Sequence, residues 1–169
     1  MIRLVEQAKL GNIDAFEMLI HYNKAMLYRI GVSMLKSDED TADAIQETLL
    51  LAYKNLHKLK EDEYFRTWLV RILINECKRI LRRKKQYEMI EQDNRAMFYY
   101  QSYGIEDEIK PYIEQLDFKL QQVIWLKYYE DFKIREIKKI LHIPESTIKT
   151  RLTKAKKQLY KLMQGGEGR

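Results

Sequence analysis

The scarcity of glycine and proline is the feature that most constrains how this chain can fold. Only six glycines and two prolines occur in 169 residues. These residue types interrupt helices and supply many turns, so their rarity favours long helices over a strand-and-turn fold. Hydrophobic residues make up 46% of the chain, which is enough to bury real cores. The sequence therefore predicts an all-α protein.

The charged residues fall into three blocks along the chain. Residues 1–85 hold 16 Lys and Arg against 12 Asp and Glu, residues 86–118 hold 2 against 8, and residues 119–163 hold 12 against 4. Two basic blocks therefore flank an acidic connector. We expect two small helical domains, residues 1–85 and 105–163, joined by a flexible linker of residues 86–104. Residues 164–169 should form a fraying tail.

Apolar spacing predicts three main helices in the first domain. The first covers Ile13–Leu35, where apolar residues recur three and four positions apart. Ser37 or Asp38 can cap a second helix that runs to about Leu56. The face expected to be buried on this second helix consists of Ala42, Ile45, Leu49, Ala52 and Leu56. A third helix is expected over Glu63–Lys85, with Phe65, Leu69, Ile72 and Ile80 buried.

The second domain is predicted to be a helix-turn-helix. Helices are expected over about Asp117–Tyr129, Lys133–Leu141 and Ser146–Met163, with Pro144 marking the turn before the last of them. Pro111 fits either a kink or the first turn of a helix. A short helix, a tight turn and a second helix that enters the major groove form the helix-turn-helix plan.

The last predicted helix separates apolar and polar residues onto opposite faces. At about 100° per residue, an apolar face contains Ile148, Leu152, Ala155, Leu159 and Leu162. Small hydroxyls that can approach base edges and cations that can reach phosphates occupy the rest. These are Ser146, Thr147, Lys149, Thr150, Arg151, Thr153, Lys154 and Lys157. A solvated lysine-rich surface helix would have the same pattern.

Two further surfaces lie in the first domain. Arg71, Asn75, Lys78 and Arg82 form a basic and polar stripe, which suits single-stranded DNA if Phe65 or Trp68 offers a stacking surface. Alternatively, both aromatics belong to the core, which is the better interpretation of Trp68. On the preceding helix, Asp43, Gln46, Glu47 and Leu50 share one side. This acidic patch suits a basic protein partner, or it is an ordinary solvated face.

The sequence does not predict an enzyme, a metal site or a cofactor site. His21, His57 and His142 are scattered, and no Gly-rich phosphate loop is present. Cys77 is the only cysteine and should be buried as a small apolar residue. The first ten residues lack the apolar core of a signal peptide, and no stretch approaches a membrane span. We expect a cytoplasmic protein without a small-molecule substrate.

Three motifs in order resemble the extracytoplasmic-function (ECF) sigma factors of bacterial RNA polymerase. They are segment 40–48 (DTADAIQET), segment 65–72 (FRTWLVRI) with Asn75, and segment 143–152 (IPESTIKTRL) with Ala155. The resemblance extends from about residue 8 to 162. It implies an alternative sigma factor that binds the polymerase core and directs promoter recognition and melting. It also implies an anti-sigma factor as a partner, of a kind that is usually anchored in the membrane.

The resemblance assigns a role to each surface. The acidic helix matches the one that docks on the coiled coil of the largest polymerase subunit, through Asp40, Asp43, Gln46, Glu47 and Leu50. The downstream promoter element, once melted, is assigned to the loop of Leu59, Lys60, Glu61, Asp62 and Glu63, and to Phe65, Arg71, Asn75, Lys78, Arg79 and Arg82. The upstream element, read as duplex, is assigned to the hydroxyls and cations of the last helix, with support from Arg135.

Three positions depart from the family pattern. Lys138 stands where alanine is usual, and His142 and Ser146 stand where glycine is usual. Lys138 could crowd the helix pair, and the backbone of His142 needs a conformation suited to the turn. One alternative is a helix-turn-helix regulator that never binds polymerase core, and a second is a helical enzyme or metal protein. The first alternative gives no reason for the acidic patch or for the basic stripe.

Overall fold

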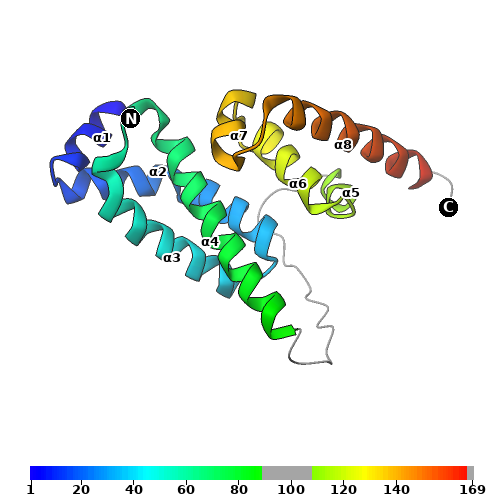
Figure 1. The fold of residues 1–169 in the computed structure, drawn as a ribbon, viewed down its shortest axis with the longest axis horizontal. Helices are drawn as coiled ribbons and strands as arrows, with labels where there is room; N and C mark the ends of the chain where they lie inside the picture. Colours follow the sequence, from blue (N-terminus) through cyan, green and yellow to red (C-terminus); the bar gives the residue numbers. More distant parts are fainter. Residues whose placement is uncertain (89–107, 167–169) are drawn as a thin grey trace. The chain divides into compact units, whose positions relative to one another are not determined.

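The computed structural model describes residues 1–88 and 108–166. Every regular element in these two ranges is a helix or a helical turn (Figure 1). The chain divides into two compact units, Met1–Tyr100 and Gln101–Arg169. The prediction of an all-α protein with two helical parts is therefore confirmed.

The first unit is built from four helices and two short 3₁₀ turns. α2, α3 and α4 pack against one another, and α1 packs on α2 and touches both turns. The elements are α1 (Ile2–Lys9), α2 (Ile13–Leu35), α3 (Asp38–Asn55), η1 (Leu56–Lys58), η2 (Asp62–Tyr64) and α4 (Phe65–Glu88).

Local hydrogen bonds explain where α2 and α3 begin. The Asn12 side chain accepts a hydrogen bond from the Ala15 amide at 3.0 Å, which caps α2. The Ser37 hydroxyl accepts from the Asp40 amide at 3.2 Å, so Ser37 rather than Asp38 caps α3. Both starts satisfy amides that a helix leaves unpaired.

The buried face of α3 differs from the expected one. Ala42 is exposed, and the prediction that it is buried is wrong. The buried residues are instead Thr41, Ala44, Thr48 and Ala52. Thr41 and Thr48 donate hydrogen bonds to the carbonyls of Ser37 and Ala44, each at 2.6 Å. Because their hydroxyls are satisfied inside the helix, these polar residues can enter the core.

α4 supplies the centre of the first core. Phe65, Leu69, Leu73 and Ile74 are at most 1% exposed, whereas Ile72 and Ile80 are only half-buried. The helix reaches Glu88, three residues beyond its predicted end. Most of the predicted linker, residues 86–104, therefore lies outside the described residues.

The second unit contains α5 (Lys110–Glu114), α6 (Phe118–Ile124), a π-helical turn η3 (Trp125–Tyr129), α7 (Ile134–Leu141) and α8 (Glu145–Gly166). Pro111 lies in the first turn of α5 and does not kink a helix. α8 packs on α5, α6 and α7. It continues through Gly165 and Gly166, where fraying was expected, and residues 167–169 lie outside the described range.

Candidate nucleic-acid and protein-binding surfaces

α7 and α8 form the predicted helix-turn-helix. Ile137, Ile140 and Ile148 are at most 1% exposed and join the two helices. His142 ends α7 in the left-handed conformation, with φ 55°, and its amide donates to the Lys138 carbonyl at 2.9 Å. This position explains why glycine would suit the turn, although histidine tolerates the conformation better than most residues. Lys138 itself is exposed and does not crowd the helix pair.

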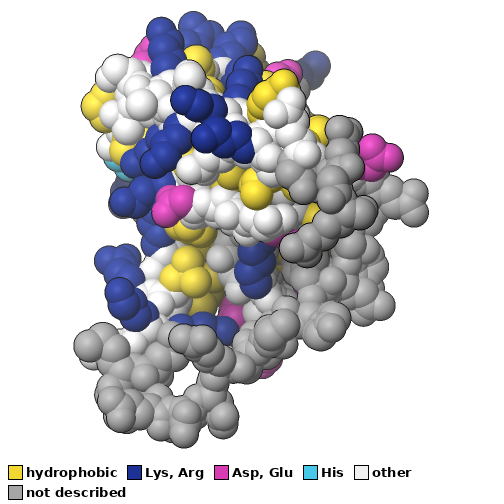
Figure 2. Space-filling model, turned by 90° about the vertical axis from the view of Figure 1, so that its right-hand side faces the viewer, with side chains coloured by type: hydrophobic (Ala, Val, Ile, Leu, Met, Phe, Trp, Pro, Cys, Tyr) yellow, Lys and Arg dark blue, Asp and Glu magenta, His cyan; other side chains and the backbone are white. Residues whose placement is uncertain are grey.

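The outer face of α8 carries the predicted DNA-binding residues. Its inner face is closed by Ile148, Leu152 and Ala155, which are at most 8% exposed. Thr147 and Arg151 are half-buried at the edge. The exposed members are Ser146, Lys149, Thr150, Thr153, Lys154 and Lys157, and Arg135 on α7 is exposed as well. Lysine and arginine side chains gather on the face of the molecule seen in Figure 2.

Two threonines on this face direct their hydroxyls to their own helix. Thr150 donates to the Ser146 carbonyl at 2.9 Å, and Thr153 donates to the Lys149 carbonyl at 3.0 Å. Their hydroxyl protons are therefore engaged. What remains for a partner is an oxygen that accepts hydrogen bonds and a methyl group.

The stripe on α4 is partly accessible. Asn75 and Arg82 are exposed, while Arg71 and Lys78 are half-buried. The Nε atom of Arg82 donates to the Lys78 carbonyl at 3.2 Å. The four residues therefore share a surface along α4, as the spacing predicted.

Phe65 cannot serve as a base-stacking surface. It is 1% exposed, and its ring centroid lies 6.1 Å from that of the half-buried Trp68. The assignment of Phe65 to DNA contact is therefore wrong. Burial of the whole ring in the first core is the physical reason, and it agrees with the alternative that this aromatic is structural.

The loop of residues 59–63 is held at its base and exposed at its tip. Leu59 is 7% exposed, so its side chain cannot contact a partner, contrary to its predicted place in the DNA site. The Lys9 ammonium donates to the Leu59 carbonyl and pairs with the Asp62 carboxylate. The exposed residues of the loop are Lys60, Glu61 and Glu63.

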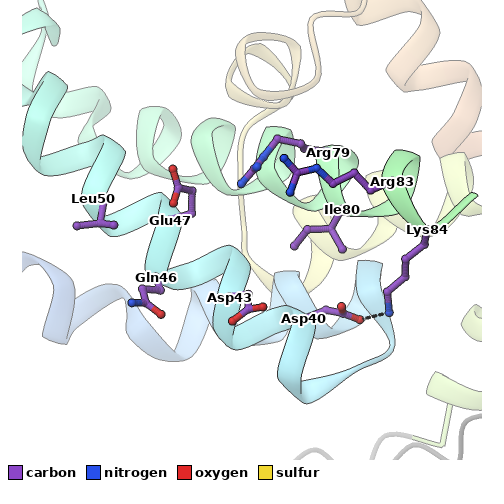
Figure 3. Close-up of a pocket in the computed structure, with 9 residues that line it drawn as sticks. All are labelled: Asp40, Asp43, Gln46, Glu47, Leu50, Arg79, Ile80, Arg83 and Lys84. Carbon is purple, nitrogen blue, oxygen red and sulfur yellow. Dashed lines mark hydrogen bonds and ion pairs between the residues drawn. The ribbon is translucent and has the colours of Figure 1, made fainter. Parts of the chain in front are cut away.

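The acidic patch on α3 forms one wall of an open groove of about 570 Å³ (Figure 3). Asp40, Asp43, Gln46, Glu47 and Leu50 all line this groove, as the spacing predicted. Asp43, Gln46 and Leu50 are exposed, and Asp40 and Glu47 are half-buried. The patch is therefore a continuous surface along α3.

The opposite wall of the groove is basic and was missed. Arg79, Ile80, Arg83 and Lys84 of α4 line it, and Lys84 forms an ion pair with Asp40. The Nε atom of Arg79 donates to Glu76 at 2.6 Å. Arg79 was assigned to the downstream promoter element, but it lines the groove that contains the acidic patch. The run of cations at residues 82–85 signalled a basic surface, but spacing alone did not indicate that it faces α3.

The prediction that Cys77 is buried is confirmed. The side chain is 0% exposed. Burial raises the pKa of this thiol to about 12, because the surrounding protein disfavours the thiolate. No group of three or more His, Cys, Asp or Glu residues that could hold a metal ion occurs within residues 1–88 and 108–166. In the same part of the chain, no helix is both long and apolar enough to cross a bilayer.

The helix-turn-helix in one unit and the acidic and basic surfaces in the other define a modular, all-helical DNA-binding protein. The Sigma-70 region 2 family model matches residues 19–87, and that of Sigma-70, region 4 matches residues 107–159. Together the two matches cover more than half of the chain. The chain belongs to the sigma-70 family, in its extracytoplasmic-function group, and is an alternative sigma factor that directs transcription initiation. Sigma factors are, in general, not enzymes.

Similar proteins agree with this family. The ECF RNA polymerase sigma factor SigW of Bacillus subtilis (strain 168) is 29% identical over 174 residues, which cover 93% of both chains. The RNA polymerase sigma factor SigV of the same strain is 27% identical over 140 residues, which cover 80% of this chain and 82% of SigV. A regulator that shared only the helix-turn-helix would not match region 2, so that alternative is disfavoured.

Two solved structures share the fold. CnrH, in complex with the cytosolic domain of CnrY, gives a TM-score of 0.74 at 23% identity over 97% of both chains. The sigma factor RpoE, in complex with the anti-sigma factor NepR from Bartonella quintana, gives a TM-score of 0.74 at 21% identity over 90% of this chain and 98% of RpoE. These similarities support the two-part helical architecture.

Proposed function

We propose that the two units divide promoter-directed initiation between them. In this proposal, residues 1–85 bind the polymerase core and the melted downstream element, and residues 105–163 bind the upstream element as duplex. The outer face of α8 carries the proposal, because exposed hydroxyl and cationic residues lie beside and opposite the buried Ile148, Leu152 and Ala155. Such a face can contact base edges through its hydroxyls and phosphates through its cations.

For core binding, we assign the α3 wall of the groove to the largest-subunit coiled coil. Carboxylates beside an exposed Leu50 favour a partner with basic and apolar residues, and they disfavour nucleic acid. The basic wall on α4 adds a requirement. Since Arg79, Arg83 and Lys84 line the same groove, a partner helix that enters it should also present acidic or polar groups on its other side.

For the downstream element, we assign the loop tip and the α4 stripe to the melted strand. Asn75 and Arg82 are exposed, and Lys78 is partly accessible, so they can neutralise phosphates or hydrogen-bond to unpaired bases. Glu61 at the loop tip and Glu63 on η2 are exposed, and their carboxylates can accept hydrogen bonds from base amino groups, which a phosphate does not have.

We also propose a protein inhibitor and a cytoplasmic location. CnrH and RpoE, which share this fold, were solved with CnrY and with the anti-sigma factor NepR. The acidic patch and the exposed Leu50 offer a comparable partner a surface that polymerase core would also need. An inhibitor anchored in the membrane would hold the sigma factor at that surface.

Transcription in vitro tests the proposal as a whole. The full-length chain is added to purified core polymerase with a fragmented genomic DNA library, and the transcripts are sequenced. We expect a small set of start sites that share an upstream and a downstream element at a fixed spacing. Starts equal to those of core polymerase alone would overturn the proposal.

A further inference from the structure

One side chain ties the loop of residues 59–63 to the N-terminal helix. At the end of α1, Lys9 Nζ donates to the Leu59 carbonyl at 2.5 Å and forms an ion pair with the Asp62 carboxylate. The side chains of Lys9 and Asp62 are only 22% and 18% exposed. Because the two acceptors lie at the start and near the end of the loop, the ammonium closes the loop across its base.

Lys9 lies on a helix that packs against the body of the first unit. Val5 and Ala8 are buried where α1 packs on α2, so the helix that carries Lys9 is fixed to the body of the unit. Leu59 is buried below the loop, and the 3₁₀ turns η1 and η2 bracket it. The base of the loop is therefore held from two sides, while its tip projects into solvent.

The tie also changes the charge that the loop presents. Three consecutive carboxylates, Glu61, Asp62 and Glu63, would repel the phosphates of an approaching strand. Lys9 neutralises the middle one and holds it at the base of the loop. Glu61 remains exposed at the tip and Glu63 remains exposed on η2, and both carboxylates can accept hydrogen bonds from a base.

We propose that Lys9 is a positioning residue for the capture of an unpaired base by this loop. It does not touch the base but fixes the loop backbone and the place of Asp62. The inference rests on the proposed function of the loop. Lys9 lies outside residues 19–87, which match Sigma-70 region 2.

The first test uses hydrogen exchange on the free full-length chain. Lys9→Met keeps the length of the side chain but removes its charge, Lys9→Arg keeps a cation, and Arg3→Met removes an exposed cation from the same helix. We expect Lys9→Met to accelerate amide exchange at residues 59–64 at least about fivefold. This corresponds to a decrease of roughly 1 kcal/mol in the free energy of opening the loop. Lys9→Arg and Arg3→Met should stay close to wild type. Unchanged exchange in Lys9→Met would overturn the proposal.

The second test measures base selection by polymerase holoenzyme. The probe is a pool of randomised single-stranded oligonucleotides, from which wild-type holoenzyme selects preferred bases at each position. We expect Lys9→Met to lower the preference at one position about fivefold and to leave the other positions unchanged, with Lys9→Arg restoring it. A general loss at all positions would indicate a merely structural role and would overturn the proposal.

Loop variants separate failure of this inference from failure of the proposed function. If Glu61→Ala with Glu63→Ala, which removes both acceptor groups, lowers the same preference while Lys9→Met does not, Lys9 has no positioning role and the loop assignment stands. If the Glu61 and Glu63 variants select bases as wild type does, the loop does not read DNA, and both ideas fail.

Discussion

A Cβ atom added to Gly31 on α2 would lie 2.8 Å from the Cγ2 atom of Thr41 on α3. Thr41 cannot rotate away easily, because its hydroxyl is bonded to the Ser37 carbonyl. The pair therefore sets how closely α2 and α3 approach, and it holds the acidic face of α3 in place.

Gly31→Ala should destabilise the protein despite the higher helix propensity of alanine. We expect a loss of about 1–3 kcal/mol in the free energy of unfolding, measured by urea denaturation, because the added methyl group overpacks a stiff contact. Thr41→Ser removes the opposing methyl and is the matched background. Gly31→Ala in that background should cost clearly less, and equal costs in both backgrounds would show that Thr41 is not the obstacle.

Charge reversal on α3 should weaken core binding. Asp43→Lys with Glu47→Lys is expected to raise the Kd for polymerase core at least about tenfold, or roughly 1.4 kcal/mol, because it places cations opposite a basic partner. Asp14→Lys with Glu17→Lys makes the same charge change at exposed sites on α2 and is the control. Wild-type affinity in the α3 variant, with unchanged helicity by circular dichroism, would refute the docking assignment.

Lys154→Ala should weaken binding to duplex promoter DNA. A contact to a base edge predicts a loss of about 1–3 kcal/mol that is confined to the preferred sequence. A contact to phosphate predicts a similar loss on every sequence and a salt slope lower by about one. Titration of duplexes by fluorescence anisotropy at several salt concentrations distinguishes the two contacts. Unchanged affinity and salt slope would remove Lys154 from the interface.

Asn75→Ala with Lys78→Ala should impair strand opening and leave duplex binding by the second unit nearly intact. Permanganate reactivity of thymines in the downstream element measures the opening. A template with a pre-melted bubble should rescue initiation only in part, because it needs less unpairing but still needs capture of the strand. The same defect on duplex and bubble templates for this variant and for Lys154→Ala would contradict the division between the units.

Cys77 should report unfolding of the first unit. Its thiol, with a pKa raised to about 12, should react with a disulfide reagent at pH 8 only when the first unit opens. Folding favours the protonated thiol. This contribution to stability is therefore complete below the ordinary pKa of 9.0 and is lost as the pH rises toward 12. Rapid labelling of the native protein would contradict the burial.

The sequence was most informative where local physics decides the outcome. α2 matches its predicted range because its apolar spacing is regular and Asn12 caps it. Prediction was wrong for Ala42 and Phe65, where neighbours in space decide exposure. The ion pair between Lys9 and Asp62 joins residues 53 positions apart, so no local pattern indicated it. The same reason explains why the basic wall opposite α3 was missed.

The hydrogen bonds made by the hydroxyls of Thr150 and Thr153 limit which groups of a base these two side chains can contact. With their protons bonded to the carbonyls of Ser146 and Lys149, these side chains offer a partner only lone pairs and methyl groups. Guanine O6 and N7 need donors, so on this face guanine would be met by the cations. The threonines themselves can contact the amino groups of cytosine and adenine and the methyl group of thymine. Replacing thymine by uracil in the duplex removes these methyl groups. It should therefore weaken binding to α8, although it leaves the hydrogen-bonding groups of the base unchanged.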